Sequence, residues 1–122
     1  MPVSSTYIHF LQALNVINAS LQANRDSAAL NPLIRASKST STGGELAVAI
    51  HADGSDEPHD FFTIRLQNGL FVLVSHDAEE RATAWKFSEG DLKEIARNPR
   101  KYIDNPALLA AEWMRRRVSV SA

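Results

Sequence analysis

Residues 61–76 read FFTIRLQNGLFVLVSH, and this stretch decides the fold class. The dipeptide Asn68-Gly69 is a strong short-range signal for a β-hairpin, because both residues tolerate the positive φ angles of a type I′ turn. Apolar residues alternate with polar ones before the turn and are almost continuous after it, which is typical of two paired strands. The stretch therefore predicts an antiparallel hairpin.

The hairpin has two faces, and the turn fixes which residues lie opposite one another. If Asn68 and Gly69 are the turn, Gln67 faces Leu70. The further pairs predicted are Leu66 with Phe71, Ile64 with Leu73, Phe62 with Ser75, Phe61 with His76, and Asp60 with Asp77. We expect Phe62, Ile64, Leu66, Phe71 and Leu73 to face the core, with Phe61, Thr63, Arg65, Leu70, Val72 and Val74 on the opposite side.

Two further strands are predicted beside the hairpin. Residues 45–51, ELAVAIH, alternate apolar with small or polar side chains, and this strand is open to pairing at its edge. Residues 82–87, ATAWKF, fit a fourth strand with Thr83, Trp85 and Phe87 on one face, although a helix is the alternative there. Residues 45–87 are thus expected to form an antiparallel β-meander of three or four strands.

Helices are predicted on both sides of the sheet region. An apolar stripe at helical spacing runs through the first helix, and Asn18 lies inside it, where a buried amide needs a hydrogen-bond partner. Asparagine before proline predicts the start of a second helix at Asn31-Pro32, within a helical segment 1–37 that a linker at 38–44 follows. The stripe consists of Tyr7, Phe10, Leu11, Leu14, Ile17 and Leu21.

The carboxy-terminal segment, 88–118, carries three helix-start signals. Ser88 and Asp91 have the spacing of a capping box, with aspartate in place of the usual glutamate. Asn98-Pro99 and Asn105-Pro106 repeat the combination of a capping residue and a proline at the first helical position. With a tail at 119–122, the chain reads as a single α+β domain spanning 1–122.

Composition excludes several classes of protein. The 122 residues include no cysteine and carry a net charge of −1, so thiol chemistry and zinc–thiolate sites are excluded and no strong field favours nucleic acid. No basic leader and no long apolar run is present, so we expect a soluble, cytoplasmic protein without a membrane partner.

Residues 50–60, IHADGSDEPHD, hold two histidines, three aspartates and a glutamate, a density that suggests a metal or acid–base site. In the predicted sheet these groups converge with the end of the hairpin. However, no two ligands show the tight spacing of known metal motifs, and Asp, Gly, Ser and Pro are ordinary turn residues. We therefore expect a solvated acidic loop and no cofactor, with a metal-dependent enzyme as an alternative. The converging residues would be His51, His59, His76, Asp53, Asp60 and Asp77.

Other catalytic and nucleic-acid signatures are weak. The adjacent residues Ser75, His76 and Asp77 cannot form a triad on a strand, because neighbours point to opposite faces. Residues 91–97, DLKEIAR, together with the arginines at 115–117, leave a nucleic-acid-binding accessory protein as a second alternative. No recognition helix follows Arg97, so we expect no nucleic-acid partner. Because the three adjacent residues cannot form a triad, we also expect no catalysis.

A protein-binding module fits the remaining features best. The second face of the hairpin is largely apolar around one arginine, so helices of the same chain, a partner, or a second copy must cover it. The first helix is almost uncharged, which also suggests cover by a partner or by this domain. We expect a non-catalytic inhibitor, adaptor or immunity-type protein that occludes a larger protein. Its contact residues would be Phe61, Arg65, Val72 and Val74.

Overall fold

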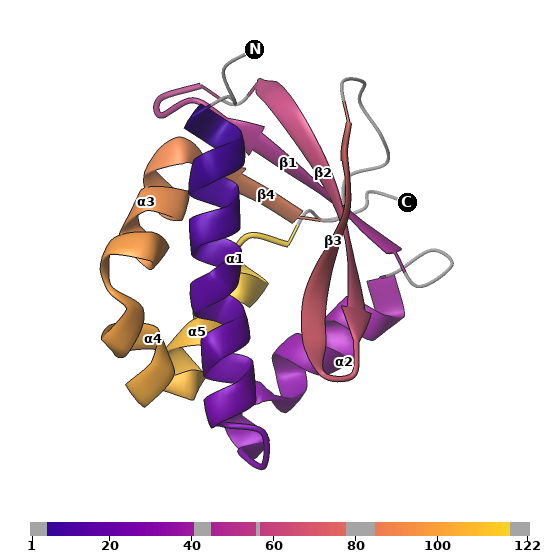
Figure 1. The fold of residues 1–122 in the computed structure, drawn as a ribbon, viewed down its shortest axis with the longest axis vertical. Coiled ribbons are helices and arrows are strands. Elements are labelled where there is room, and N and C mark those ends of the chain that lie inside the picture. Colours follow the sequence, from indigo (N-terminus) through magenta and orange to yellow (C-terminus); the bar gives the residue numbers. More distant parts are fainter. Residues whose placement is uncertain (1–4, 41–44, 56, 78–84, 118–122) are drawn as a thin grey trace.

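The computed structural model describes residues 5–40, 45–55, 57–77 and 85–117, which form an α+β fold (Figure 1). The amino-terminal helices precede a mixed sheet, and further helices follow it. In chain order the elements are α1 (Ser5–Ala23), η1 (Ala28–Leu30), α2 (Asn31–Thr40), β1 (Glu45–His51), β2 (Pro58–Gln67), β3 (Leu70–Asp77), β4 (Trp85–Ser88), α3 (Glu89–Arg97), α4 (Pro99–Asp104) and α5 (Pro106–Arg115).

The sheet has the strand order β3-β2-β1-β4, so the predicted antiparallel meander is wrong in its last strand. β4 pairs in parallel with β1, whereas β1 with β2 and β2 with β3 are antiparallel. A parallel neighbour requires a crossover rather than a tight turn. In this position Trp85 and Phe87 are buried against Trp113 of α5, which explains why the strand lies there. β1 is consequently a central strand and not an open edge.

The hairpin turn is confirmed, and the predicted register holds for its first half. Asn68 and Gly69 have positive φ angles of 54° and 80°, and Ile64 lies opposite Leu73 as expected. A register shift between Thr63 and Ile64 then leaves Val74 as an extra residue on β3. The predicted pairs beyond this bulge are wrong by one residue, since Thr63 pairs with Ser75, Phe62 with His76 and Phe61 with Asp77.

The bulge changes the face on which His76 lies. Because it now pairs with Phe62, His76 joins the inner face, where the two rings stack with centroids 4.5 Å apart. Phe10 of α1 stacks on the same Phe62 ring at 4.1 Å. A nearly continuous apolar strand such as β3 shows no alternation that could reveal an inserted residue, so the sequence could not have placed it.

Helix α1 lies between the sheet and the pair α3 and α4 (Figure 1). Phe10 represents the side that packs on the sheet, while Val16 and Ser20 are buried on the side that meets the carboxy-terminal helices. The Ser20 hydroxyl donates a hydrogen bond of 2.8 Å to the carbonyl of Tyr102 in α4. The low charge of α1 is thus explained within this chain, because two of its sides are buried.

Helix boundaries differ from the predicted ones in small ways. α2 continues to Thr40, so only residues 41–44 of the expected linker could lie outside a helix, and these are outside the described residues. The predicted strand residue Thr83 and the tail at 119–122 also lie outside the described residues. Among the described helices, none is long and apolar enough to cross a membrane.

Candidate functional site

The outer patch, defined here as Arg65, Val72 and Val74, lies on the side of the β2–β3 hairpin that faces away from α1. Val72 and Val74 are 45% and 44% exposed, and they are two of the three large hydrophobic residues that are exposed in the described part of the chain. Arg65 pairs with Val72 across the strands, and its guanidinium lies 2.8 Å from the Glu45 carboxylate of β1. The helices that could have covered this face leave both valines open to solvent.

Phe61, which was predicted to belong to the same contact surface, is only 8% exposed and offers little area to a partner. It lies on the central strand β2 between Ala49 of β1 and Asp77 of β3, and both Ala49 and the nearby Thr63 are buried as well. Val72 and Val74, in contrast, lie on the edge strand. The accessible part of the outer face is therefore its β3 side.

The open edge of β3 is partly closed by a side chain of α1. The Asn18 amide donates a hydrogen bond of 2.8 Å to the carbonyl of Phe71 and accepts one of the same length from its backbone N–H. It thus occupies the position that a backbone partner would take in a fifth strand. This is the partner that the amide in the apolar stripe was expected to need, and it favours contact through the face of β3 over strand addition at this point.

Replacing Asn18 with leucine should lower the free energy of unfolding by about 2 kcal/mol, since two hydrogen bonds to partly buried backbone groups are lost at about 1 kcal/mol each. Urea denaturation measures the loss. Hydrogen exchange of the Phe71 amide should accelerate in the variant, and Asn15→Leu, on the exposed side of the same helix, serves as the control. An unchanged exchange rate at Phe71 would contradict the assigned contact.

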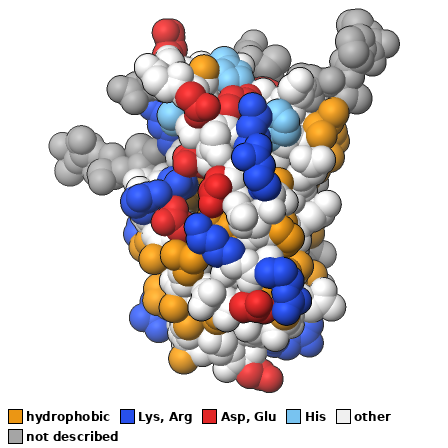
Figure 2. Space-filling view, turned by 90° about the vertical axis from the view of Figure 1, so that its left-hand side faces the viewer, with side chains coloured by type: hydrophobic (Ala, Val, Ile, Leu, Met, Phe, Trp, Pro, Cys, Tyr) orange, Lys and Arg blue, Asp and Glu red, His pale blue; other side chains and the backbone are white. Residues whose placement is uncertain are grey.

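The histidines and carboxylates that were predicted to converge are divided among separate partners at one end of the molecule, where Figure 2 shows the histidine side chains. His76 bonds to the Asp60 carboxylate, and the Nδ1 atom of His51 lies 3.0 Å from the carbonyl of its neighbour Ala52. His59 turns instead to Glu89, 3.4 Å away. Among the described residues no group of three such side chains is placed to hold a metal ion.

Glu89, the first residue of α3, is the centre of a cluster that the sequence did not predict. Its carboxylate accepts a hydrogen bond from the Thr6 hydroxyl and lies 3.2 Å from Nδ1 of His9, besides its contact with His59. Three elements, α1, β2 and α3, are joined through this one side chain. His9 is the one histidine of α1, and nothing in the sequence indicates that its partner lies 80 positions away.

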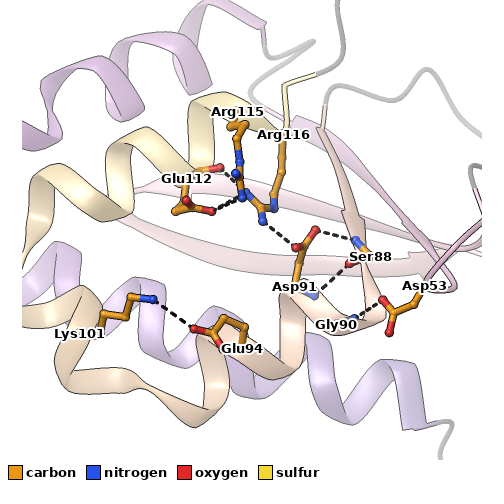
Figure 3. Close-up of polar contacts among 9 residues, drawn as sticks. All are labelled: Asp53, Ser88, Gly90, Asp91, Glu94, Lys101, Glu112, Arg115 and Arg116. Atoms are coloured by element: carbon orange, nitrogen blue, oxygen red, sulfur yellow. Dashed lines mark hydrogen bonds and ion pairs between the residues drawn. The ribbon is translucent and has the colours of Figure 1, made fainter.

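The acidic loop after β1 has a structural role through Asp53. Its carboxylate accepts a hydrogen bond of 2.9 Å from the backbone N–H of Gly90 in the first turn of α3 (Figure 3). A Cβ atom at position 90 would lie 2.8 Å from the same carboxylate oxygen, which accounts for glycine there. The cluster of acidic residues in 50–60 thus includes one group that stabilises a helix start.

Two of the arginines considered for nucleic-acid binding form ion pairs within this chain. Arg116 is 12% exposed and joins α3 to α5, with its guanidinium 2.6 Å from Asp91 and 2.7 Å from Glu112 (Figure 3). Arg115 lies 2.8 Å from Glu112. Burial would raise the pKa of Asp91, but hydrogen bonds from Arg116 and Ser88 outweigh it and hold the pKa below its ordinary value.

Comparison with protein families, characterised proteins and solved structures found no match for this chain.

Proposed function

We propose that this chain is a non-catalytic protein-binding module of the inhibitor, adaptor or immunity type, which acts by occluding a larger protein. The observation that supports this proposal is the outer patch, where two exposed valines, two positions apart, and one arginine lie on the β2–β3 strand pair. Apolar side chains beside an arginine are typical of the residues that dominate binding energy at interfaces.

Each member of the outer patch has a distinct role in the proposed complex. Val72 and Val74 supply apolar area, which stabilises an interface by roughly 25 cal/mol for each Å² removed from water. The Arg65 guanidinium, held by Glu45, keeps further N–H donors for a carboxylate or carbonyl of the partner. Because the three residues are on strands, their backbone is already ordered and loses little conformational entropy on binding.

The proposal is tested by changing one valine and following the partner. We expect Val72→Asp to weaken a complex captured from lysate of the source cells at least tenfold, while the melting temperature stays nearly unchanged because residue 72 is exposed. Ile8→Asp is a matched control, since Ile8 is equally exposed at 44% but lies on α1. Quantitative mass spectrometry of the captured proteins is the measurement.

Two other results would redirect the proposal. Loss of the partner in Ile8→Asp but not in Val72→Asp would move the binding surface to α1 and contradict the outer patch. If light scattering shows a dimer of this chain that Val72→Asp dissociates, the partner is a second copy. A captured partner that binds both variants with unchanged affinity would exclude the outer patch as its binding site.

A further inference from the structure

A second surface, the α1–α3 groove, lies on the other side of the molecule from the outer patch. It is lined by His9, Gln12 and Asn15 of α1 and by Lys93, Ala96 and Arg97 of α3, and it is a shallow depression of about 670 Å³ that is largely open to solvent. Figure 2, which views the molecule from the α3 side, shows lysine and arginine side chains on this face, interspersed with acidic ones. None of the six lining residues is acidic.

Lys93 lacks the ion pair that its position on α3 would favour, because the carboxylate at the matching position contacts other residues. Glu89 precedes it by four residues on α3, the spacing and order that favour an ion pair on a helix surface. The Glu89 carboxylate instead turns to Thr6, His9 and His59. Among the described residues, Lys93 forms no ion pair.

Arg97 is in the same situation one turn further along. Glu94 precedes it by three residues, but its carboxylate is paired with Lys101 of α4 at 3.2 Å (Figure 3). In the described part of the chain Arg97 has no carboxylate partner either. The two exposed cations are four residues apart on one face, where like charges repel each other. An anion bound between them would remove this repulsion.

The α1 wall of the groove indicates what kind of anion fits. Gln12 and Asn15 are exposed amides that donate and accept hydrogen bonds as peptide groups do. Only two lysine or arginine residues line the groove, and the chain has a net charge of −1, so a long polyanion is not favoured.

We propose that the α1–α3 groove binds an acidic peptide segment of a partner protein, with carboxylates of the segment paired to Lys93 and Arg97. Gln12 and Asn15 contact its backbone. This site is independent of the outer patch, so either proposal stands if the other fails.

The test is a titration of the ¹⁵N-labelled full chain followed by NMR. The probe is an end-blocked synthetic peptide rich in glutamate with one leucine, and the same peptide with glutamine in place of glutamate is the control ligand. We expect the acidic peptide to shift the amide resonances of Gln12, Asn15, Lys93 and Arg97, and the affinity to fall several-fold when salt is raised. The glutamine peptide should leave these resonances in place.

Lys93→Glu separates binding from stability. The variant places a glutamate four residues before Arg97, which is the favourable order on a helix, so the melting temperature should stay the same or rise. Affinity for the acidic peptide should fall at least tenfold. Arg35→Glu, an exposed site on α2 with the same change of charge, should keep most of the affinity.

Three results would overturn the proposal. Equal loss of affinity in Lys93→Glu and Arg35→Glu would show that the peptide responds only to net charge. Shifts confined to residues outside the groove would place the binding elsewhere. Tighter binding of inorganic phosphate or of a single-stranded oligonucleotide at the same resonances would assign the groove to another class of anion.

Discussion

Trp113→Ala should lower the free energy of unfolding by about 3–5 kcal/mol, a large part of the total stability of a domain of this size. Trp113 is 3% exposed, and its ring contacts those of Phe71, Trp85 and Phe87 with centroids 5.0, 5.0 and 5.7 Å away. Its indole N–H also donates to the hydroxyl of Ser37 at 3.2 Å. Alanine leaves a cavity where the hairpin, β4 and α2 meet α5.

Urea denaturation followed by far-ultraviolet circular dichroism measures this loss without relying on tryptophan fluorescence. Trp113→Phe keeps an aromatic ring at the site and should lose clearly less stability than alanine. Arg115→Ala, two positions further along the same helix and exposed, controls for a general effect on α5. Near-equal stability of Trp113→Ala and wild type would mean that this residue is not central to the core.

Arg116→Met should cost about 2–3 kcal/mol at neutral pH, less than the loss of one partner from a fully buried ion pair because this site is partly solvated. The substitution keeps an apolar stem, but it removes the guanidinium that lies 5.7 Å from the centre of the Phe87 ring and leaves Asp91 and Glu112 without their shared cation. Arg115→Met is the control, since Arg115 is far more exposed and its loss should change stability little.

The pH dependence of this loss follows from Asp91. Its folded pKa lies below the ordinary value of 3.8, so its ionised form stabilises the fold above that pH, and this contribution disappears as the pH falls through the folded pKa. The difference in stability between wild type and Arg116→Met should therefore shrink as the pH is lowered from 5 towards 2. A difference that stays constant over this range would contradict the role given to Asp91.

Local signals in the sequence predicted local structure well. The turn at Asn68-Gly69 is confirmed, and so is the capping box, in which the Ser88 hydroxyl accepts from the Asp91 N–H and the Asp91 carboxylate accepts from the Ser88 N–H, each at 3.0 Å. In each case the residues that form the contact are at most three positions apart. Their chemistry therefore carries the whole signal.

The asparagines before proline were predicted correctly as helix boundaries but with the wrong contacts. α4 begins at Pro99 and α5 at Pro106. Each asparagine occupies the N-cap position, yet neither side chain forms a hydrogen bond to the helix that follows. Asn98 instead donates to the carbonyl of Glu94, at 3.0 Å, in the helix that precedes it. Asn105 does the same to Lys101 at 3.2 Å. With a single residue between two helices, its side chain can bond either to the last turn of the preceding helix or to the first turn of the following one. The residue type alone does not determine which.

The features of the sheet and of the site that were not predicted all depend on contacts between distant parts of the chain. The bulge at Val74, the parallel position of β4 and the cover over Phe61 are choices of the assembled core, for which no short stretch carries a signal. Glu89 looked like an ordinary first-turn acid of α3. The contacts of its carboxylate with α1 and β2, which leave Lys93 without an ion-pair partner among the described residues, depend on how these elements assemble.

The position of α1 between the sheet and the last helices has a consequence for folding. The contacts that bury its second side join residues more than 80 positions apart, such as Thr6 with Glu89 and Ser20 with Tyr102. Such a topology has high contact order, which is associated with slow folding because the chain must close large loops before it gains these contacts. During synthesis α1 leaves the ribosome before α3 and α4, which cover it, so a nascent chain that ends before α3 carries an exposed apolar helix. We expect such chains to need a chaperone until residues 89–104 have emerged.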